Sequence, residues 1–169
     1  TVTISNNKIG LALDGVDVIE NKGIGVKMTG ANKNTVVENY ISGNTSHGIF
    51  VESAQTAQNT ISRNFIGVDI NSVVKQNGGD GINLNSCKEN TIDDNVIGGN
   101  QGAGISLNGT DTDDNIIEGN YIGIDKNDNP IGNNGSGVYI SSTATANDVG
   151  GATPAQANYI SNNGEHGIE

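Results

Sequence analysis

The sequence predicts an all-β solenoid, a coil built from short parallel strands, and two repeated patterns with a regular spacing predict it. The first pattern, Asn-Thr-Ile-x-x-Asn-x-Ile, recurs with small changes at residues 34–41, 59–66, 90–97 and 115–122. The second pattern is Gly followed by apolar-x-apolar, and it starts at Gly23, Gly48, Gly81, Gly104 and Gly137. Self-similarity at a spacing of tens of residues is typical of solenoids, whose repeats bury their apolar faces only against neighbours.

The first pattern predicts two short strands joined by a bend, because apolar and polar residues alternate in it. Partial copies at residues 3–9 and 147–160 extend the series in both directions. The alternation places Ile61, Ile92 and Ile117 in one inward column. At each bend an Asn lies on the inward side, where stacked amides would form a ladder. These residues are Asn39, Asn64, Asn95, Asn120 and Asn158.

The second pattern predicts a third short strand in each coil, with Ile82 and Leu84 inward in one copy. Only 33% of the chain is apolar. This fraction is enough to fill the core of a solenoid, because each strand contributes only about two inward side chains. Helix is excluded because Gly, Asn and β-branched residues interrupt every helical window. The chain contains 25 Gly, which fits tight turns and left-handed corners.

Equivalent positions show a larger unit. Asn34 and Asn90 are 56 positions apart, as are Gly48 and Gly104. We therefore expect one domain over residues 1–169, with about six coils in three double coils, roughly 1–57, 58–114 and 115–169. The long coil of each pair carries a loop, as at residues 66–80 and 122–136, and these loops should lie on one side of the stack. We also expect the chain to be a fragment of a longer repeat array.

The formal net charge of −11 argues against a nucleic-acid partner, because phosphates would be repelled. It is compatible with divalent cations and with an extracellular polymer. The single Cys87 excludes an internal disulfide. No apolar run is long enough for membrane insertion.

The two patterns, the Ile-Gly-x-Asp loops and the insert at residues 149–161 resemble the right-handed parallel β-helix repeats of the pectin-lyase-like superfamily. Such repeats recur in large bacterial secreted and surface proteins, and the resemblance covers essentially the whole chain. It implies a right-handed parallel β-helix and an extracellular or cell-surface location. It implies no single activity, because the superfamily includes polysaccharide lyases, glycoside hydrolases, epimerases, phage tailspikes, adhesins and non-catalytic arrays.

The sequence shows no catalytic constellation. His47 and His166 each precede a pattern Gly, as in pectin-hydrolysing β-helix enzymes, but other copies hold Lys, Asp, Ala or Ser at that position. Asp93 and Asp94 could act as an acid/base pair, yet they occupy variable positions of the repeat. We therefore predict no catalytic residue, and an enzyme of the lyase or glycoside hydrolase type is the alternative.

One outward column next to the bend Asn residues is rich in aromatic side chains. Stacked strands lie about 4.8 Å apart, so these rings would form a stripe along the stack. Sugar rings present apolar faces to aromatic rings, and the stripe is therefore a candidate glycan-binding site; the alternative is that the rings simply stack on one another. The residues are Tyr40, Phe65, Tyr121 and Tyr159.

Two acidic turns supply candidate calcium ligands, and calcium is the one cofactor that the sequence suggests. Alternating oxygen-bearing side chains are typical of calcium loops. Asp and Asn are also ordinary turn residues, and Pro130 replaces the turn Gly of an EF-hand loop. The candidates are Asp111, Asp113, Asp114, Asp125, Asn127 and Asp128.

The leading hypothesis is a non-catalytic structural or adhesin-type module of a bacterial secreted or cell-surface protein, which binds polysaccharide along the aromatic stripe. The alternatives are a carbohydrate-active enzyme or a fragment of one, and a fibre subunit that assembles end to end. End-to-end assembly is an alternative because the terminal coils have no sequence typical of a capping helix and would expose unpaired strand edges. The expected partners are a polysaccharide or cell-surface partner, and further coils or copies at the ends.

Overall fold

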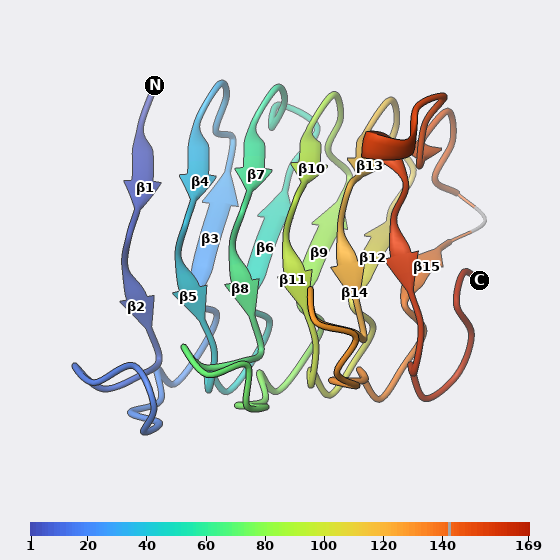
Figure 1. The fold of residues 1–169 in the computed structure, drawn as a ribbon. Coiled ribbons are helices and arrows are strands. Elements are labelled where there is room, and N and C mark those ends of the chain that lie inside the picture. Colours follow the sequence, from blue (N-terminus) through green and yellow to red (C-terminus); the bar gives the residue numbers. More distant parts are fainter. Residues whose placement is uncertain (142) are drawn as a thin grey trace.

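The computed structural model describes residues 1–141 and 143–169. The chain winds into a stack of flat coils, with its two ends at opposite ends of the stack (Figure 1). Its strands form three parallel sheets of six, six and five strands. The helical content described is one 3-10 turn, η1 (Pro154–Gln156), and no described helix is long and apolar enough to cross a membrane. The all-β parallel architecture that the repeats predict is therefore confirmed.

Sheets 1 and 2 come from the two strands of the Asn-Thr-Ile-x-x-Asn-x-Ile pattern. Sheet 1 contains β1 (Thr3–Ser5), β4 (Thr35–Val37), β7 (Thr60–Ser62), β10 (Thr91–Asp93), β13 (Ile116–Glu118) and β16 (Asp148–Val149). Sheet 2 contains β2 (Lys8–Ile9), β5 (Tyr40–Ile41), β8 (Phe65–Ile66), β11 (Val96–Ile97), β14 (Tyr121–Ile122) and β17 (Tyr159–Ile160).

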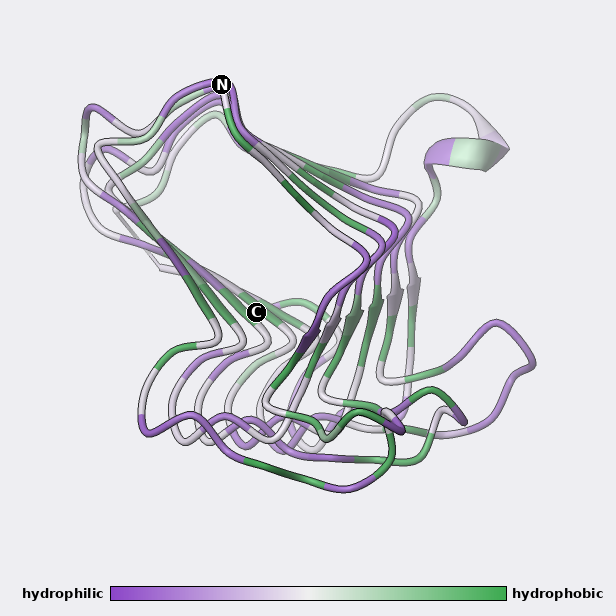
Figure 2. Ribbon diagram, turned by 90° about the vertical axis from the view of Figure 1, so that its left-hand side faces the viewer, coloured by the Kyte–Doolittle hydropathy of each residue, from purple (hydrophilic) through white to green (hydrophobic). Residues whose placement is uncertain are grey.

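Sheet 3 comes from the Gly-apolar-x-apolar pattern, but the predicted start of the first copy at Gly23 is wrong. Val26 pairs with Ile49 and Met28 with Val51, so Gly25 is the equivalent of Gly48. Sheet 3 contains β3 (Val26–Thr29), β6 (Ile49–Glu52), β9 (Ile82–Asn85), β12 (Ile105–Asn108) and β15 (Val138–Ile140). Seen along the stack, the three sheets form the sides of a hollow-looking prism (Figure 2), whose interior is filled by side chains.

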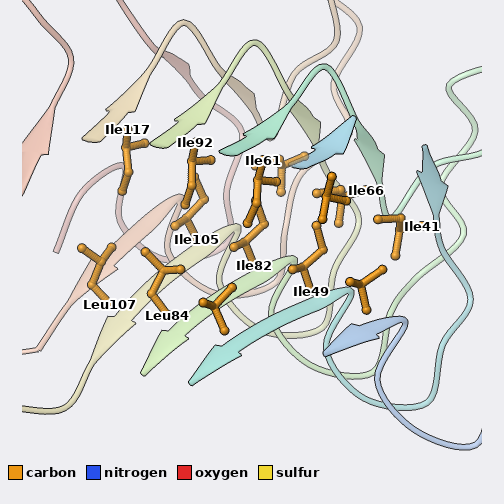
Figure 3. Close-up of a cluster of buried hydrophobic side chains, with 14 of the residues drawn as sticks. Ile41, Ile49, Ile61, Ile66, Ile82, Leu84, Ile92, Ile105, Leu107 and Ile117 are labelled. Carbon is orange, nitrogen blue, oxygen red and sulfur yellow. The ribbon is translucent and has the colours of Figure 1, made fainter. Parts of the chain in front are cut away.

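The core is a set of apolar columns that run the length of the stack (Figure 3). In sheet 1, Ile61 pairs in register with Ile92, and Ile92 with Ile117. All three side chains are completely buried. In sheet 3, Ile82 and Leu84 pair with Ile105 and Leu107 in the same manner. The register places like residues over like residues, as the alternation predicts.

The Asn ladder between sheets 1 and 2 is present. The backbone N–H and Nδ2 of Asn64 both donate to Oδ1 of Asn95, at 2.9 and 3.0 Å. Asn95 donates in the same way to Asn120, at 3.0 Å for both bonds. The residue before each of these Asn residues has a positive φ, as at Arg63 (53°) and Asp94 (56°), and this turns the amide inward.

Two further Asn ladders lie at the other corners. One precedes sheet 1, where Asn59 donates to Asn90 and Asn90 to Asn115. The other follows sheet 2, where Asn77 donates to Asn100 and Asn100 to Asn133. The amides therefore hydrogen-bond neighbouring coils at three corners of each turn of the solenoid.

Three loops project from one side of the stack, between sheets 2 and 3 (Figure 2). We name them loop 1 (residues 10–20), loop 2 (67–76) and loop 3 (123–132). Each closes on itself through an antiparallel bridge: Leu11 with Val18, Val68 with Val74, and Ile124 with Pro130.

Candidate functional site

The aromatic stripe consists of two stacked pairs. The ring centroids of Tyr40 and Phe65 are 4.7 Å apart with an interplanar angle of 11°. Those of Tyr121 and Tyr159 are 4.9 Å apart with an angle of 13°. Val96 lies between the pairs, because β11 pairs with β8 on one side and with β14 on the other. Within each pair one face of each ring is covered by the other ring.

The middle of this stripe is partly covered by the loops. Phe65 and Tyr121 pack against a small apolar cluster formed by Val68, Val96 and Ile131. Nζ of Lys126 also lies 5.5 Å from the centroid of the Tyr121 ring. Tyr159, with 53% of its surface exposed, presents the most open ring of the four. Glycan binding by the stripe stays a prediction.

The acidic turn in loop 3 is organised by Asp125. Its Oδ1 accepts the backbone N–H of Asn127 (2.8 Å) and of Asn129 (2.9 Å), and its Oδ2 accepts Nδ2 of Asn129 (2.9 Å). Burial alone would raise the pKa of Asp125, but these hydrogen bonds outweigh burial and lower that pKa. The carboxylate therefore holds the turn together, and Asp128 occupies a left-handed position with a φ of 63°.

The other acidic turn follows β12. Oδ1 of Asp113 accepts the backbone N–H and the hydroxyl of Thr145, at 3.1 and 2.6 Å, which ties this turn to the next coil. Asp114 has a φ of 55°, and Asp111 is exposed. Among residues 1–141 and 143–169, no three His, Cys, Asp or Glu side chains are grouped as metal ligands. Calcium binding stays a prediction.

A polar groove lies on the outer face of sheet 3, over β12 and β15 and the turns before them. Its volume is about 450 Å³. The lining side chains are hydroxyls, amides, carboxylates and one aromatic ring. They include Asp80, Gln101, Ser106, Asn108, Asn134, Ser136, Tyr139, Glu165 and Glu169.

Asp80 is the most highly connected side chain of the groove. Its Oδ2 accepts Nδ2 of Asn83 and the hydroxyl of Ser106, both at 2.7 Å, and its Oδ1 accepts the backbone N–H of Ala103 at 2.9 Å. These bonds join the turn before β9 and β9 itself to the next strand of the sheet, β12, and its preceding turn. Asp80 therefore fixes the wall of the groove in one geometry.

His47 supports Asp80 from the neighbouring coil. Its Nδ1 accepts the backbone N–H of Asp80 at 3.0 Å, and its ring stacks on Phe50 with centroids 5.4 Å apart. Ser106 donates to Asp80 and not to His47. A nucleophilic serine needs its base within hydrogen-bond reach, so these three side chains do not form a catalytic triad.

Asp93 ends β10 on the outer face of sheet 1, and Asp94 follows it at the bend toward sheet 2, with a φ of 56°. Oδ2 of Asp93 accepts the hydroxyl of Ser62 at 2.9 Å, whereas its buried Oδ1 has no partner among the described residues. Burial raises the pKa of Asp93, the hydrogen bond from Ser62 and the charge of Arg63 oppose this, and the charges of Asp94 and Glu118 add to it.

This raised pKa leads to a prediction for Asp93→Asn. The folded state binds the proton of Asp93 more tightly than the unfolded state does. The ionised carboxylate therefore lowers the stability of the protein at neutral pH, and this loss disappears as the pH falls through the folded pKa and the side chain becomes protonated. The variant should be more stable than the parent at neutral pH, and the difference should shrink toward about pH 4. Urea unfolding across this range measures the effect, with exposed Asp111→Asn as the matched control. A constant difference between variant and parent would contradict the prediction.

The groove is a candidate site that the sequence analysis did not predict. Asp80 and Ser136 occupy the variable position before the pattern Gly, while Ser106 and Tyr139 occupy the x of apolar-x-apolar. That x position points outward, so a run of polar and aromatic residues there was the available signal.

Comparison with known proteins identifies the fold family. A family model described as "Right handed beta helix region" matches residues 1–169. No curated protein and no solved structure matches the chain.

Proposed function

The chain belongs to the right-handed β-helix family, and because this fold specifies no single activity we propose its function from the surface of the coils. We propose that it is a non-catalytic module of a bacterial secreted or cell-surface protein that binds a neutral polysaccharide in the groove of sheet 3. The observation that carries the proposal is the combination of volume and polar lining in that groove.

The lining matches the hydrogen-bonding chemistry of sugars. A sugar hydroxyl both donates and accepts, and the groove offers hydroxyls at Ser106 and Ser136 and amides at Asn108 and Asn134. Tyr139 adds an aromatic ring on which a sugar can pack. A volume of about 450 Å³ falls in the usual range of small-ligand sites.

Charge favours a neutral polymer over an acidic one. Asp80, Glu165 and Glu169 line the groove, and no Lys or Arg is among its lining residues in the described chain. The net charge of the whole chain is −11. A polyuronate would be repelled by this field, whereas the carboxylates can accept hydrogen bonds from the hydroxyls of a neutral sugar.

The internal bonds of the groove support binding rather than turnover. Asp80 accepts three hydrogen bonds, and Oε2 of Glu169 accepts the hydroxyl of Ser136 at 2.7 Å. Carboxylates held in this way maintain a rigid, preorganised lining, which reduces the entropy that a ligand must overcome.

The test measures binding to soluble neutral and uronate-containing polysaccharides, with two double variants. Tyr139→Ala with Asn134→Ala alters the groove, and Tyr40→Ala with Tyr121→Ala alters the aromatic stripe. We expect a neutral polysaccharide to bind the parent and the groove variant to lose roughly tenfold or more in affinity, with little change in the stripe variant.

Three outcomes would count against this proposal. Binding that is lost only in the stripe variant would move the site to the aromatic column. Preferential binding of polyuronates would contradict the charge argument. Release of new reducing ends from a polysaccharide by the purified protein would show an enzyme.

A further inference from the structure

Exposed aliphatic side chains gather in loops 1 and 2. Of the ten large hydrophobic residues that are exposed in the described part of the chain, six lie in these two loops. Leu13 is 95% exposed, Ile19 67% and Val73 53%. We name this surface the loop face, and it consists of Leu13, Val18, Ile19, Ile70, Val73 and Val74.

The two loops are held against each other and against the coils. The backbone N–H of Ile70 donates to the carbonyl of Gly15 at 3.3 Å. The side chain of Ile70 also packs over Gly15, where an added Cβ would lie 2.7 Å from Cγ2 of Ile70. Val18 lies against Gly43 in the same way, 2.6 Å from the position of an added Cβ. The loop face is therefore one supported surface rather than two separate loops.

The polar groups within the loop face are largely satisfied by the loops themselves. Oδ1 of Asp14 accepts the backbone N–H of Val16 and Asp17 at 2.9 and 3.2 Å. Nζ of Lys8 donates to the carbonyl of Leu13 at 2.8 Å, and Asp69 in loop 2 is buried beside Lys75. The carboxylates of Asp14 and Asp17 are nevertheless exposed in loop 1, next to Leu13 and Val18 in the chain.

Loop 3 shows that the fold does not require this apolar character. It occupies the equivalent place in the third double coil and closes through the equivalent bridge. Its exposed residues nevertheless include no large aliphatic side chain; they are Lys126, Asn127, Asp128, Asn129 and Pro130. The aliphatic residues of loops 1 and 2 therefore need another explanation than the folding of the loop.

We propose that the loop face is a dimer interface that binds the loop face of a second copy of this chain. An apolar patch is complementary to itself, which suits a two-fold interface in which each residue set meets its own counterpart. The exposed carboxylates of Asp14, Asp17 and Glu20 in loop 1 make this contact sensitive to salt. The exposed parts of the six side chains amount to on the order of 500 Å² per copy, or roughly 1,000 Å² for the pair, at the low end for specific interfaces. The dimer is accordingly weak, with a dissociation constant on the order of 10⁻⁴ M.

This interface is independent of the proposed glycan groove. The groove lies on sheet 3 over β12 and β15, whereas loops 1 and 2 follow β2 and β8 of sheet 2. A two-fold axis through loops 1 and 2 brings two N-terminal halves together and leaves both grooves open. Glycan binding in the groove and dimerisation through the loop face can therefore be tested independently of each other.

The experiment is sedimentation velocity of the full chain from about 10 µM to 1 mM, at low and high salt. We expect the average mass to rise toward that of a dimer, and to rise further at high salt, because each copy has a net charge of −11 and salt screens their repulsion. Leu13→Asp with Val73→Asp should keep the chain monomeric throughout. The matched control Asn127→Asp adds negative charge to polar loop 3 and should dimerise nearly like the parent.

The substitutions are at exposed positions, so urea unfolding should confirm that the double variant keeps the stability of the parent. Ile19→Lys provides a second disruption with the opposite charge. A parent that stays monomeric up to 1 mM, or a dimer that both disruptive variants retain, would overturn the proposal. A continuous series of higher masses that the variants do not affect would show end-to-end assembly instead.

Discussion

Asn95→Ala is expected to destabilise the protein by roughly 3–6 kcal/mol. Oδ1 of Asn95 accepts both the N–H and Nδ2 of Asn64, and Nδ2 of Asn95 donates to the carbonyl of Ile61. All of these groups are buried, and water cannot reach them after the amide is removed. The variant thus leaves several donors and acceptors unpaired, at about 1–3 kcal/mol each.

The measurement is urea unfolding with linear extrapolation, and exposed Asn127→Ala is the matched control. The side chain of Asn127 lies on the surface of loop 3, so this variant should change the free energy of unfolding by less than about 0.5 kcal/mol. Equal losses in the two variants would show that the ladder contributes nothing specific.

Gly81→Ala is the second large effect that we expect, with a loss of roughly 3 kcal/mol or more. The reason is that the neighbouring coil leaves no space for a side chain at Gly81. A Cβ at Gly81 would lie 2.6 Å from the carbonyl oxygen of Gly104 and 2.7 Å from Cγ2 of Ile97. The same carbonyl accepts the backbone N–H of Ile82 at 2.9 Å, so the added methyl would force apart two hydrogen-bonded coils.

Gly23→Ala is the matched control for this prediction. Gly23 lies two residues before Gly25, which is the structural equivalent of Gly81 in the first coil. No heavy atom lies within 4 Å of an added Cβ at Gly23, and its φ is not positive. Its free energy of unfolding should therefore stay within about 0.5 kcal/mol of the parent. Thermal and urea unfolding of the two variants distinguish a steric requirement from a general cost of replacing Gly.

The core could be predicted from the sequence because the two-residue periodicity of a strand fixes which side chains point inward. A shift of one residue would move Ile61 and Ile92 from the interior to the surface, so the repeats specify both the faces and the register. The ladder at Asn64 and Asn95 follows for the same reason. The ladder through Asn77, Asn100 and Asn133 is harder to see, because its distance from the preceding Asn-Thr-Ile pattern varies with the loops: Asn77 follows Ile66 by 11 positions, whereas Asn100 follows Ile97 by 3.

The surface features could be predicted only in part. The positions of Tyr40, Phe65, Tyr121 and Tyr159 in one column follow from the repeat, but the packing of loops 2 and 3 against Phe65 and Tyr121 does not. That packing depends on how each loop folds back after its Asp, and the residues that follow Asp69 differ from those that follow Asp125. The groove was missed because Asp80 and Tyr139 occupy positions that the fold leaves free to vary.

The central claim is that successive coils lie directly over one another, and distances between spin labels test it most directly. The outward positions Thr3, Thr91, Ile116 and Asp148 belong to one row of sheet 1, with Thr35 and Thr60 between the first two. Cysteines at these positions can be labelled selectively. Native Cys87 is buried, and burial raises the pKa of its thiol to about 12, so it reacts poorly.

Labels at Thr3 and Thr91, Thr3 and Ile116, and Thr3 and Asp148 are three, four and five strands apart in this row. At about 4.8 Å per strand, the backbone separations should be roughly 14, 19 and 24 Å. The label distances should therefore be narrow and increase by one strand spacing from pair to pair. Broad distributions, or distances that do not increase in this order, would contradict the stacked arrangement.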